Sequence, residues 1–268
     1  MQKLRRGPAY ARAFLQELDE AGEIPGRHTD LQRIASTLNL EVREVDAQGF
    51  DGSLIRAKDL PLGAILVRQS IREASRKKFT IAHELGHFFL HGHDQIDGVC
   101  VSGDIGNWGG EAKALEREAD EFAAELLMHG ALVLPVIHSM SPSLQAIEKI
   151  AMLCGTSLSA AAWRFCDLTR ERCAVVWSAA REIQWSKRSQ YFGFRLTKGA
   201  TLQPATFAFA CFSGRNSGPE PLPVLAELWI GSKNLPEGAK VWEQSKALPS
   251  YGSVISLLWI KERRTALS

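Results

Sequence analysis

The residues at positions 83–87, His-Glu-Leu-Gly-His, have the types and the spacing of a hydrolytic metal site. On a helix, residues four apart share one face, so the imidazoles of His83 and His87 can reach the same point. Neutral imidazole binds zinc well, and two such ligands leave room for a third ligand and a water molecule. Glu84 is turned about 100° from His83 on the helix. In zinc peptidases a glutamate at this place does not bind the metal but takes a proton from the metal-bound water.

A catalytic zinc site needs a third protein ligand, and the acidic helix predicted over Glu111–Met128 offers several carboxylates. Glu116 and Asp120 lie four residues apart and share one face of this helix. Glu116 is the expected metal ligand, and Glu118 is the alternative ligand. Asp120 is expected to accept the second ring N–H of one zinc-bound histidine, which fixes that ring's tautomer and orientation. The competing interpretation of these acids is a solvated helix face.

His91 follows His87 by a further four residues. A third ligand from the same stretch of helix would crowd the first two and distort a tetrahedral site. We interpret His91 as a cation that favours a helix C-terminus, or as a group that supports a ligand without binding the metal.

These side chains need a scaffold, and the hydrophobic pattern predicts it as mainly helical with a small three-stranded sheet. The strand expected at Gly63–Arg68 can offer an edge for an extended substrate. Two helices joined at Gly155-Thr156 have the length of a helix-turn-helix. The predicted helices are Pro8–Glu20, Asp30–Leu38, about 75–91, Glu111–Met128, Ser143–Cys154 and Ser157–Leu168, and the predicted strands are Glu41–Asp46, Gly52–Ala57 and Gly63–Arg68.

The pattern changes after residue 170, where short runs rich in Val, Trp, Phe and Ile alternate with turn residues. This alternation is typical of an antiparallel β domain. The expected fold class is therefore α+β, with a helical domain at 1–169 and a β-rich domain at 170–268 that has a sensory or partner-binding role. The predicted strands are Cys173–Trp177, Tyr191–Leu196, Ala205–Phe212, Val224–Ile230 and Val254–Ile260.

The composition is that of an ordinary soluble globular protein, with 45% hydrophobic and 23% charged residues in a chain of 268. The 5 cysteines form no CxxC pair, which argues against a disulfide framework and fits the cytoplasm. No apolar run reaches the length of a membrane span, and no signal peptide follows Met1. Residues 1–169 hold 18 Lys and Arg against 23 Asp and Glu, whereas residues 170–268 hold 14 against 7. We interpret the basic residues as a solvated surface because they are scattered.

The segment Arg76–His87, taken together with Glu116–Met128, resembles the ImmA/IrrE family of zinc metallopeptidases. The resemblance spans residues 29–168. It implies zinc ligands at His83, His87 and Glu116, a catalytic glutamate at Glu84, and the family's Asp or Asn position at Asp120. Met128-His129 departs from the Met-Pro that the family often has there, which affects the helix exit more than the chemistry.

The resemblance also implies a biological role. Members of the family are bacterial cytoplasmic proteins that cut a partner transcriptional repressor, often a helix-turn-helix protein, in stress or mobile-element responses. The expected protein is therefore a regulatory metalloendopeptidase that uses Zn²⁺, with Mn²⁺ as a second metal that can support activity. In one branch of the family a GAF-like sensor domain follows the peptidase. Residues 170–268 occupy the corresponding place in this chain, but they carry no motif of such a domain.

Two other functions compete with the peptidase. The first is DNA binding by the helices at 143–168, but residues 141–168 balance Lys149 and Arg164 against Glu148 and Asp167. A recognition helix that approaches phosphates should be more basic, so direct DNA binding is not expected. The second is a sensor with a structural or vestigial metal site. Its pocket would be lined by aromatic side chains that otherwise form core, namely Trp177, Trp185, Tyr191, Phe192 and Phe194.

Overall fold

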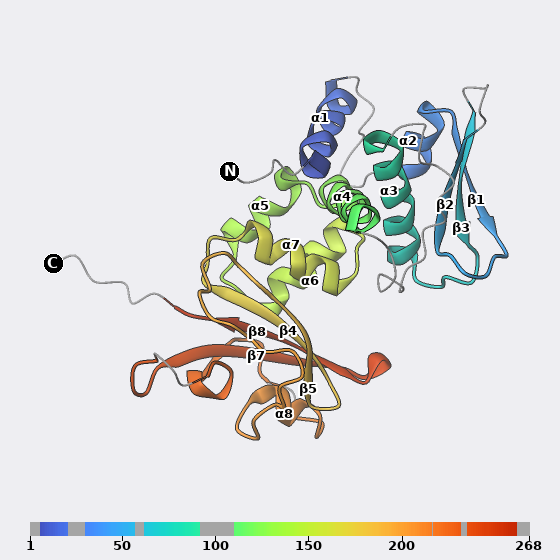
Figure 1. The fold of residues 1–268 in the computed structure, drawn as a ribbon. Coiled ribbons are helices and arrows are strands. Elements are labelled where there is room, and N and C mark those ends of the chain that lie inside the picture. The colour runs from blue at the N-terminus through green and yellow to red at the C-terminus, as the bar shows by residue number, and fades with distance from the viewer. Residues whose placement is uncertain are drawn as a thin grey trace. The chain divides into compact units, whose positions relative to one another are not determined.

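The computed structural model describes residues 6–20, 30–56, 62–91, 110–215, 217–231 and 235–261. Over these residues the chain forms eight α-helices, a mixed sheet of three strands and an antiparallel sheet of five strands (Figure 1), which confirms the α+β fold class. The helices are α1 (Arg6–Glu20), α2 (Leu31–Thr37), α3 (Ala74–Leu90), α4 (Gly110–Leu127), α5 (Gly130–Ser139), α6 (Leu144–Cys154), α7 (Leu158–Leu168) and α8 (Phe207–Cys211). The strands are β1 (Leu40–Val45), β2 (Gly52–Arg56), β3 (Gly63–Arg68), β4 (Cys173–Ala179), β5 (Glu182–Arg188), β6 (Leu222–Leu225), β7 (Lys240–Leu248) and β8 (Ser253–Trp259).

The chain divides into two compact units. The first unit comprises Met1–Leu132 and Met152–Ser157, and the second comprises Val133–Ala151 and Leu158–Ser268. Most of α6 and all of α7 therefore belong to the same unit as the five-stranded sheet. The two units group residues that contact one another. The division into domains at 1–169 and 170–268 stays a prediction.

In the first unit, α3 lies between the three-stranded sheet and α4 (Figure 1). The sheet has the order β1-β3-β2, in which β3 runs parallel to β1 and antiparallel to β2. Leu54, Ile65 and Val67 are buried, whereas Ile55 is exposed, as expected for a sheet covered on one face. The prediction that Gly63–Arg68 offers a free edge is wrong, because β3 is the central strand and is paired on both sides.

The start of α2 is capped by a side chain. Asp30 is the N-cap, and its carboxylate accepts hydrogen bonds from the backbone N–H groups of Gln32 and Arg33 at 3.1 and 3.0 Å. Such caps satisfy backbone donors that have no partner inside the helix. Residues 92–109, between α3 and α4, lie outside the described residues.

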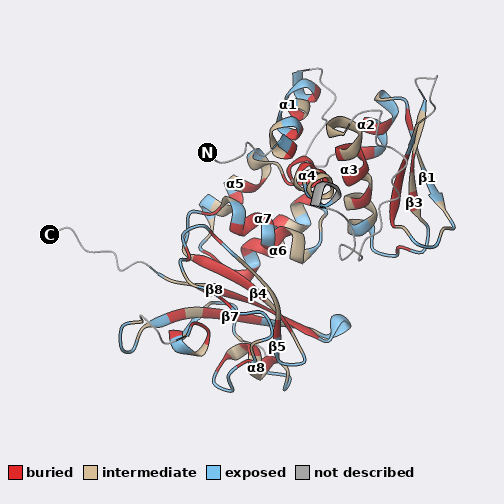
Figure 2. Cartoon of the chain, in the orientation of Figure 1, coloured by how far each residue is buried: buried red, intermediate tan, exposed pale blue. Residues whose placement is uncertain are grey.

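The second unit is built on the antiparallel sheet of order β5-β4-β8-β7-β6. Most residues of its central strands are buried (Figure 2). One group of core side chains packs the sheet against α8. Helix α6 is tied to β7 by a hydrogen bond from the backbone N–H of Leu144 to Gln244 at 2.7 Å, and by an ion pair between Glu148 and Lys246 at 2.6 Å.

Three of the predicted strands in this unit are corrected by the structure. Ala205–Phe212 forms α8 instead of a strand, because Thr206 caps a helix by accepting the N–H of Phe209 at 3.2 Å. Tyr191–Leu196 forms no strand, and its buried members Phe192 and Leu196 reach the core from irregular chain. Val224–Ile230 is only partly a strand, because the chain turns into a 3-10 helix at Ala226–Leu228.

The aromatic residues considered for a pocket pack as two pairs, and the fifth, Tyr191, is exposed. Phe192 is fully buried in the core beside α8, and Phe194 packs against the same core. Trp177 and Trp185 stack on each other with ring centroids 5.7 Å apart, and Trp185 contacts Trp163 of α7 at 6.0 Å. This distribution favours the interpretation of these residues as packing.

Within the described ranges, no helix taken alone has the length and apolar character needed to cross a membrane. Among the described helices, the pair Lys113–Leu127 and Gly130–Ser139 reaches that length and composition together, and it is bent by 66° at its break.

Candidate metal centre

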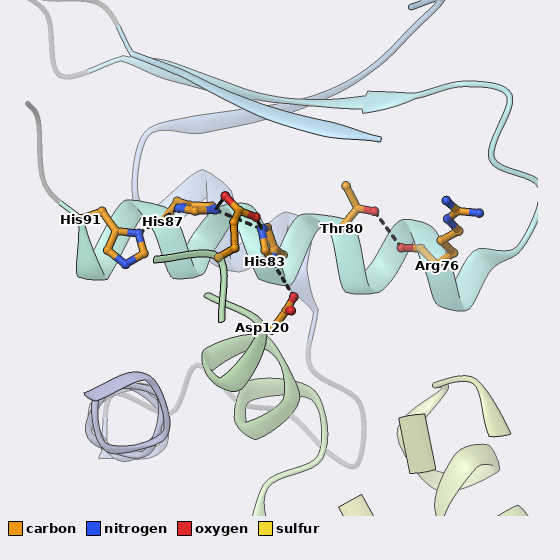
Figure 3. A network of polar contacts seen from close by, with 7 residues as sticks. Arg76, Thr80, His83, His87, His91 and Asp120 are labelled. Carbon is orange, nitrogen blue, oxygen red and sulfur yellow. Dashed lines mark hydrogen bonds and ion pairs between the residues drawn. The ribbon is translucent and has the colours of Figure 1, made fainter. Parts of the chain in front are cut away.

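Helix α3 presents His83 and His87 on one face, as the spacing predicts. Their rings are 4.7 Å apart between centroids, and their Nε2 atoms are 3.0 Å apart. Both histidines are mostly buried, with side chains 11% and 16% exposed. Figure 3 shows the two imidazoles side by side along the helix.

Helix α4 brings Glu116 to the same point. Its carboxylate oxygens lie 3.1 Å from Nε2 of His83 and 3.3 Å from Nε2 of His87. The three side chains form a group whose ligand atoms all lie within 4.8 Å of one another. Two imidazoles and one carboxylate are a donor set that suits a catalytic zinc ion, which uses three protein ligands and keeps one position open. The residues present therefore fit a divalent metal.

The surroundings keep Glu116 in the state that a ligand needs. Burial raises the pKa of its carboxyl group, but hydrogen bonds from His83 and His87 outweigh burial and bring the pKa well below its usual range. The carboxylate is thus ionised at neutral pH and available to a cation.

The close approach of α3 and α4 depends on a glycine inside the motif. A Cβ at Gly86 would lie 2.9 Å from Cα of Ala119 and 3.0 Å from its carbonyl oxygen. These distances are too short for a side chain, so Gly86 allows the backbones to meet. Ala119 lies three residues after Glu116 on α4, so the contact sets how far Glu116 reaches toward the two histidines.

Asp120 lies one helical turn after Glu116 and contacts His83 from the other side of its ring. Its Oδ1 is 2.9 Å from Nδ1 of His83 (Figure 3). When Nε2 of His83 binds a cation in place of its hydrogen bond to Glu116, the proton of the ring lies on Nδ1 and is donated to Asp120. This arrangement is the one expected for a carboxylate that orients a metal-binding histidine.

Glu84 is fully buried and lies against β2. A Cβ at Gly52 would lie 2.6 Å from Oε1 of Glu84 and 2.4 Å from Cγ2 of Thr80. Only a glycine at this strand position leaves room for the carboxylate. The strand and Thr80 therefore confine the carboxylate of Glu84, the residue that follows His83 in the motif.

Ion pairs around the buried Asp51 hold β2 in this register on α3. Asp51, with a side chain 8% exposed, accepts hydrogen bonds from Nε and Nη2 of Arg76 at 3.0 and 2.5 Å and also pairs with Arg68. Asp51 directly precedes Gly52, and Arg76 lies in the first turn of α3. Sequence reasoning did not find this contact, because its partners are 25 residues apart and no local pattern links them.

Glu118, the alternative ligand, lies outside the group formed by His83, His87 and Glu116. Its Oε2 is 3.6 Å from Nε2 of His91. His91 is the C-cap of α3, with a side chain only 5% exposed. Burial and the neighbouring His87 lower the pKa of His91, although Glu118 opposes the change. A lowered pKa disfavours the interpretation of His91 as a cation.

Comparisons with known proteins add to this geometry. The model of the IrrE N-terminal-like domain, Peptidase_M78, matches residues 35–165. A solved structure described as a Mycobacterium tuberculosis transcriptional regulator is similar with a TM-score of 0.58, 14% identity, and coverage of 93% of this chain and 76% of that chain. At this identity the likeness concerns the fold alone. A search of curated proteins found no match.

Proposed function

Because the chain belongs through residues 35–165 to the ImmA/IrrE family of M78 peptidases, we propose that it is a zinc-dependent metalloendopeptidase that hydrolyses a peptide bond in a regulatory protein. The observation that carries the proposal is the convergence of His83, His87 and Glu116 from two helices, with the buried carboxylate of Glu84 on the next residue of α3.

His83, His87 and Glu116 would hold the metal, which when bound lowers the pKa of a water ligand and polarises the scissile carbonyl. Glu84 accepts the proton of the attacking water and passes it to the leaving amine. The contact with Gly52 and Thr80 restricts the carboxylate of Glu84 to few positions. A confined general base keeps the reacting geometry without an entropic cost at each turnover.

The expected substrate is a helix-turn-helix transcriptional repressor in the cytoplasm. The family resemblance supports this class of substrate. The solved structure with a similar fold is named a transcriptional regulator, which is compatible with a regulatory role. The preference for a protein substrate over a small molecule rests on the match to a peptidase family.

Cleavage by matched variants tests the proposal. Wild-type protein, Glu84→Gln and the control Glu17→Gln, which changes an exposed glutamate of α1, are incubated with zinc or manganese and a repressor from a neighbouring reading frame. We expect cleavage by wild type and by E17Q, and a loss of at least 100-fold in E84Q, in the range of general acid–base catalysis. Equal cleavage by E84Q and wild type would refute the role of Glu84.

The alternative function is a DNA-binding or ligand-sensing regulator with a structural metal site. The helices α6 and α7 do not favour DNA binding, because Arg164 is buried and Asp167 is paired with Lys187 at 2.6 Å. A recognition helix needs exposed basic groups that reach phosphates. Zinc bound without cleavage of any repressor would support the sensing alternative.

A further inference from the structure

His87 has a buried neighbour on the side of its ring that faces away from Glu116. Nδ1 of His87 lies 2.9 Å from Nδ1 of His91 (Figure 3). Nε2 of His87 lies 3.3 Å from a carboxylate oxygen of Glu116. We propose that His91 is a positioning residue that accepts the Nδ1–H of His87 and thereby fixes the tautomer and orientation of this metal ligand. The inference rests on the proposed metal site.

The tautomers follow from the two contacts. Two ring nitrogens at 2.9 Å share one proton, because two N–H groups facing each other would repel. When Nε2 of His87 gives its lone pair to a cation, the proton of His87 is on Nδ1, and His91 accepts it with its own Nδ1. His91 then carries its proton on Nε2.

Glu118 supplies the charge that favours this tautomer of His91. Nε2 of His91 is buried, with no hydrogen-bond partner among the described residues, and the carboxylate of Glu118 lies 3.6 Å away. This distance is longer than a hydrogen bond, so the interaction is a charge contact. A negative charge beside Nε2 stabilises an N–H at that position. The described contacts thus run from His87 through His91 to Glu118, with a hydrogen bond at the first step and a charge contact at the second.

The arrangement matches the one around the other histidine ligand. His83 is held at Nδ1 by Asp120, and His87 is held at Nδ1 by His91. Both supporting carboxylates, Asp120 and Glu118, come from α4, which also supplies Glu116. The partner of His83 is charged and 55% exposed, whereas the partner of His87 is a buried ring. The orientation of the His87 ring is therefore expected to depend more strongly on the shape of its neighbour than the orientation of the His83 ring does.

The test compares His91→Leu, which removes the acceptor, with His91→Asn, whose amide oxygen can accept the same N–H. His138→Leu, at an exposed position of α5, is the matched control. The readouts are the zinc affinity of the full chain in competition with a chromophoric chelator, and the visible spectrum of the cobalt-loaded protein. The melting temperature of the metal-free protein shows whether each variant is folded.

We expect H91L to bind zinc about 10–100-fold more weakly with an altered cobalt spectrum, as is typical for lost support of a ligand. H91N should recover most of the affinity, and H138L should behave as wild type. Wild-type affinity in H91L overturns the inference, and so does an H91N as weak as H91L, because the ring would then act only by filling space.

A second variant tests the role of His91 if H91L does not fold. Glu118→Leu removes the charge beside Nε2 of His91 and should weaken zinc binding about 3–10-fold. This loss is smaller than the change of about 10–100-fold typical when a residue hydrogen-bonded to a metal ligand is removed, because Glu118 acts on His87 only through His91. Unchanged affinity in E118L together with an unfolded H91L overturns the inference. A wild-type protein that binds no zinc refutes the proposed function itself, whereas a wild type that binds and cleaves beside unaffected variants refutes only the role of His91.

Discussion

Gly86 of α3 and Ala119 of α4 meet so closely that a Cβ at position 86 would lie 2.9 Å from Cα of Ala119. This contact joins the helix of the two histidines to the helix of Glu116. Gly86→Ala should therefore push α4 away from α3, lower the free energy of unfolding by about 1–3 kcal/mol as overpacking does, and weaken zinc binding.

Thermal melting and chelator competition measure both effects of G86A. The control is Gly218→Ala, where a Cβ would meet no atom within 4 Å. A G86A protein with wild-type stability and zinc affinity would show that α4 can shift without moving Glu116.

Gly52→Ala should impair catalysis while leaving metal binding intact. The new Cβ would lie 2.6 Å from Oε1 of Glu84, so the carboxylate has to leave its position. A displaced general base costs up to about 100-fold in rate. Steady-state cleavage and zinc content of the same sample measure the two properties. A G52A protein that loses zinc and activity in proportion would show that the strand acts on the ligands and not on Glu84.

Asp120→Ala should weaken zinc binding about 10–100-fold, because His83 loses the acceptor that orients it. Asp120→Asn should have a smaller effect, since its amide oxygen can still accept from Nδ1 of His83. Asp19→Ala, at an exposed position of α1, is the control. Chelator competition distinguishes the variants, and equal affinities of D120A and D19A would contradict the role assigned to Asp120.

The buried carboxyl group of Glu243 makes the second unit sensitive to pH. Burial raises the pKa of Glu243, against hydrogen bonds from Trp229, Ser245 and the backbone N–H of Ala208, which favour the ionised form. The folded state then holds a proton that the unfolded state has already released, so stability falls as pH rises from the ordinary pKa of glutamate through the raised pKa.

Urea unfolding across this pH range, followed by tryptophan fluorescence, tests the sign. Glu243→Gln should remove the dependence that this group contributes, and its single carbonyl oxygen leaves one of the donors unsatisfied, which lowers stability at all pH values. A wild-type stability that rises through the same window, with no change of slope in E243Q, would contradict the prediction.

The elements around the site were predictable because their signals are local. The motif helix, the three short strands and the helix of Glu116 follow from the hydrophobic pattern of their own residues. The contacts of Gly86 with Ala119 and of Asp51 with Arg76 were not predictable, since they join segments distant in sequence. Both contacts depend on the tertiary packing that the periodicity alone does not fix.

The second unit was harder to predict for two physical reasons. Helix α5 contains Pro135, which reads as a helix breaker, and was missed. Strand β7 was missed because it buries the polar residues Glu243, Gln244 and Ser245 and lacks the alternating pattern of a half-covered strand. Segment 205–212 has strand-forming residues, yet the side chain of Thr206 caps a helix there.

Anomalous diffraction at the zinc edge shows whether His83, His87 and Glu116 bind one metal ion. Crystals grown with zinc should show one strong peak per chain at about 2.0–2.1 Å from Nε2 of both histidines and about 2.0–2.2 Å from a carboxylate oxygen of Glu116. A peak bound through other residues, or a peak at the histidines with Glu116 turned away and Glu118 in its place, would contradict the account.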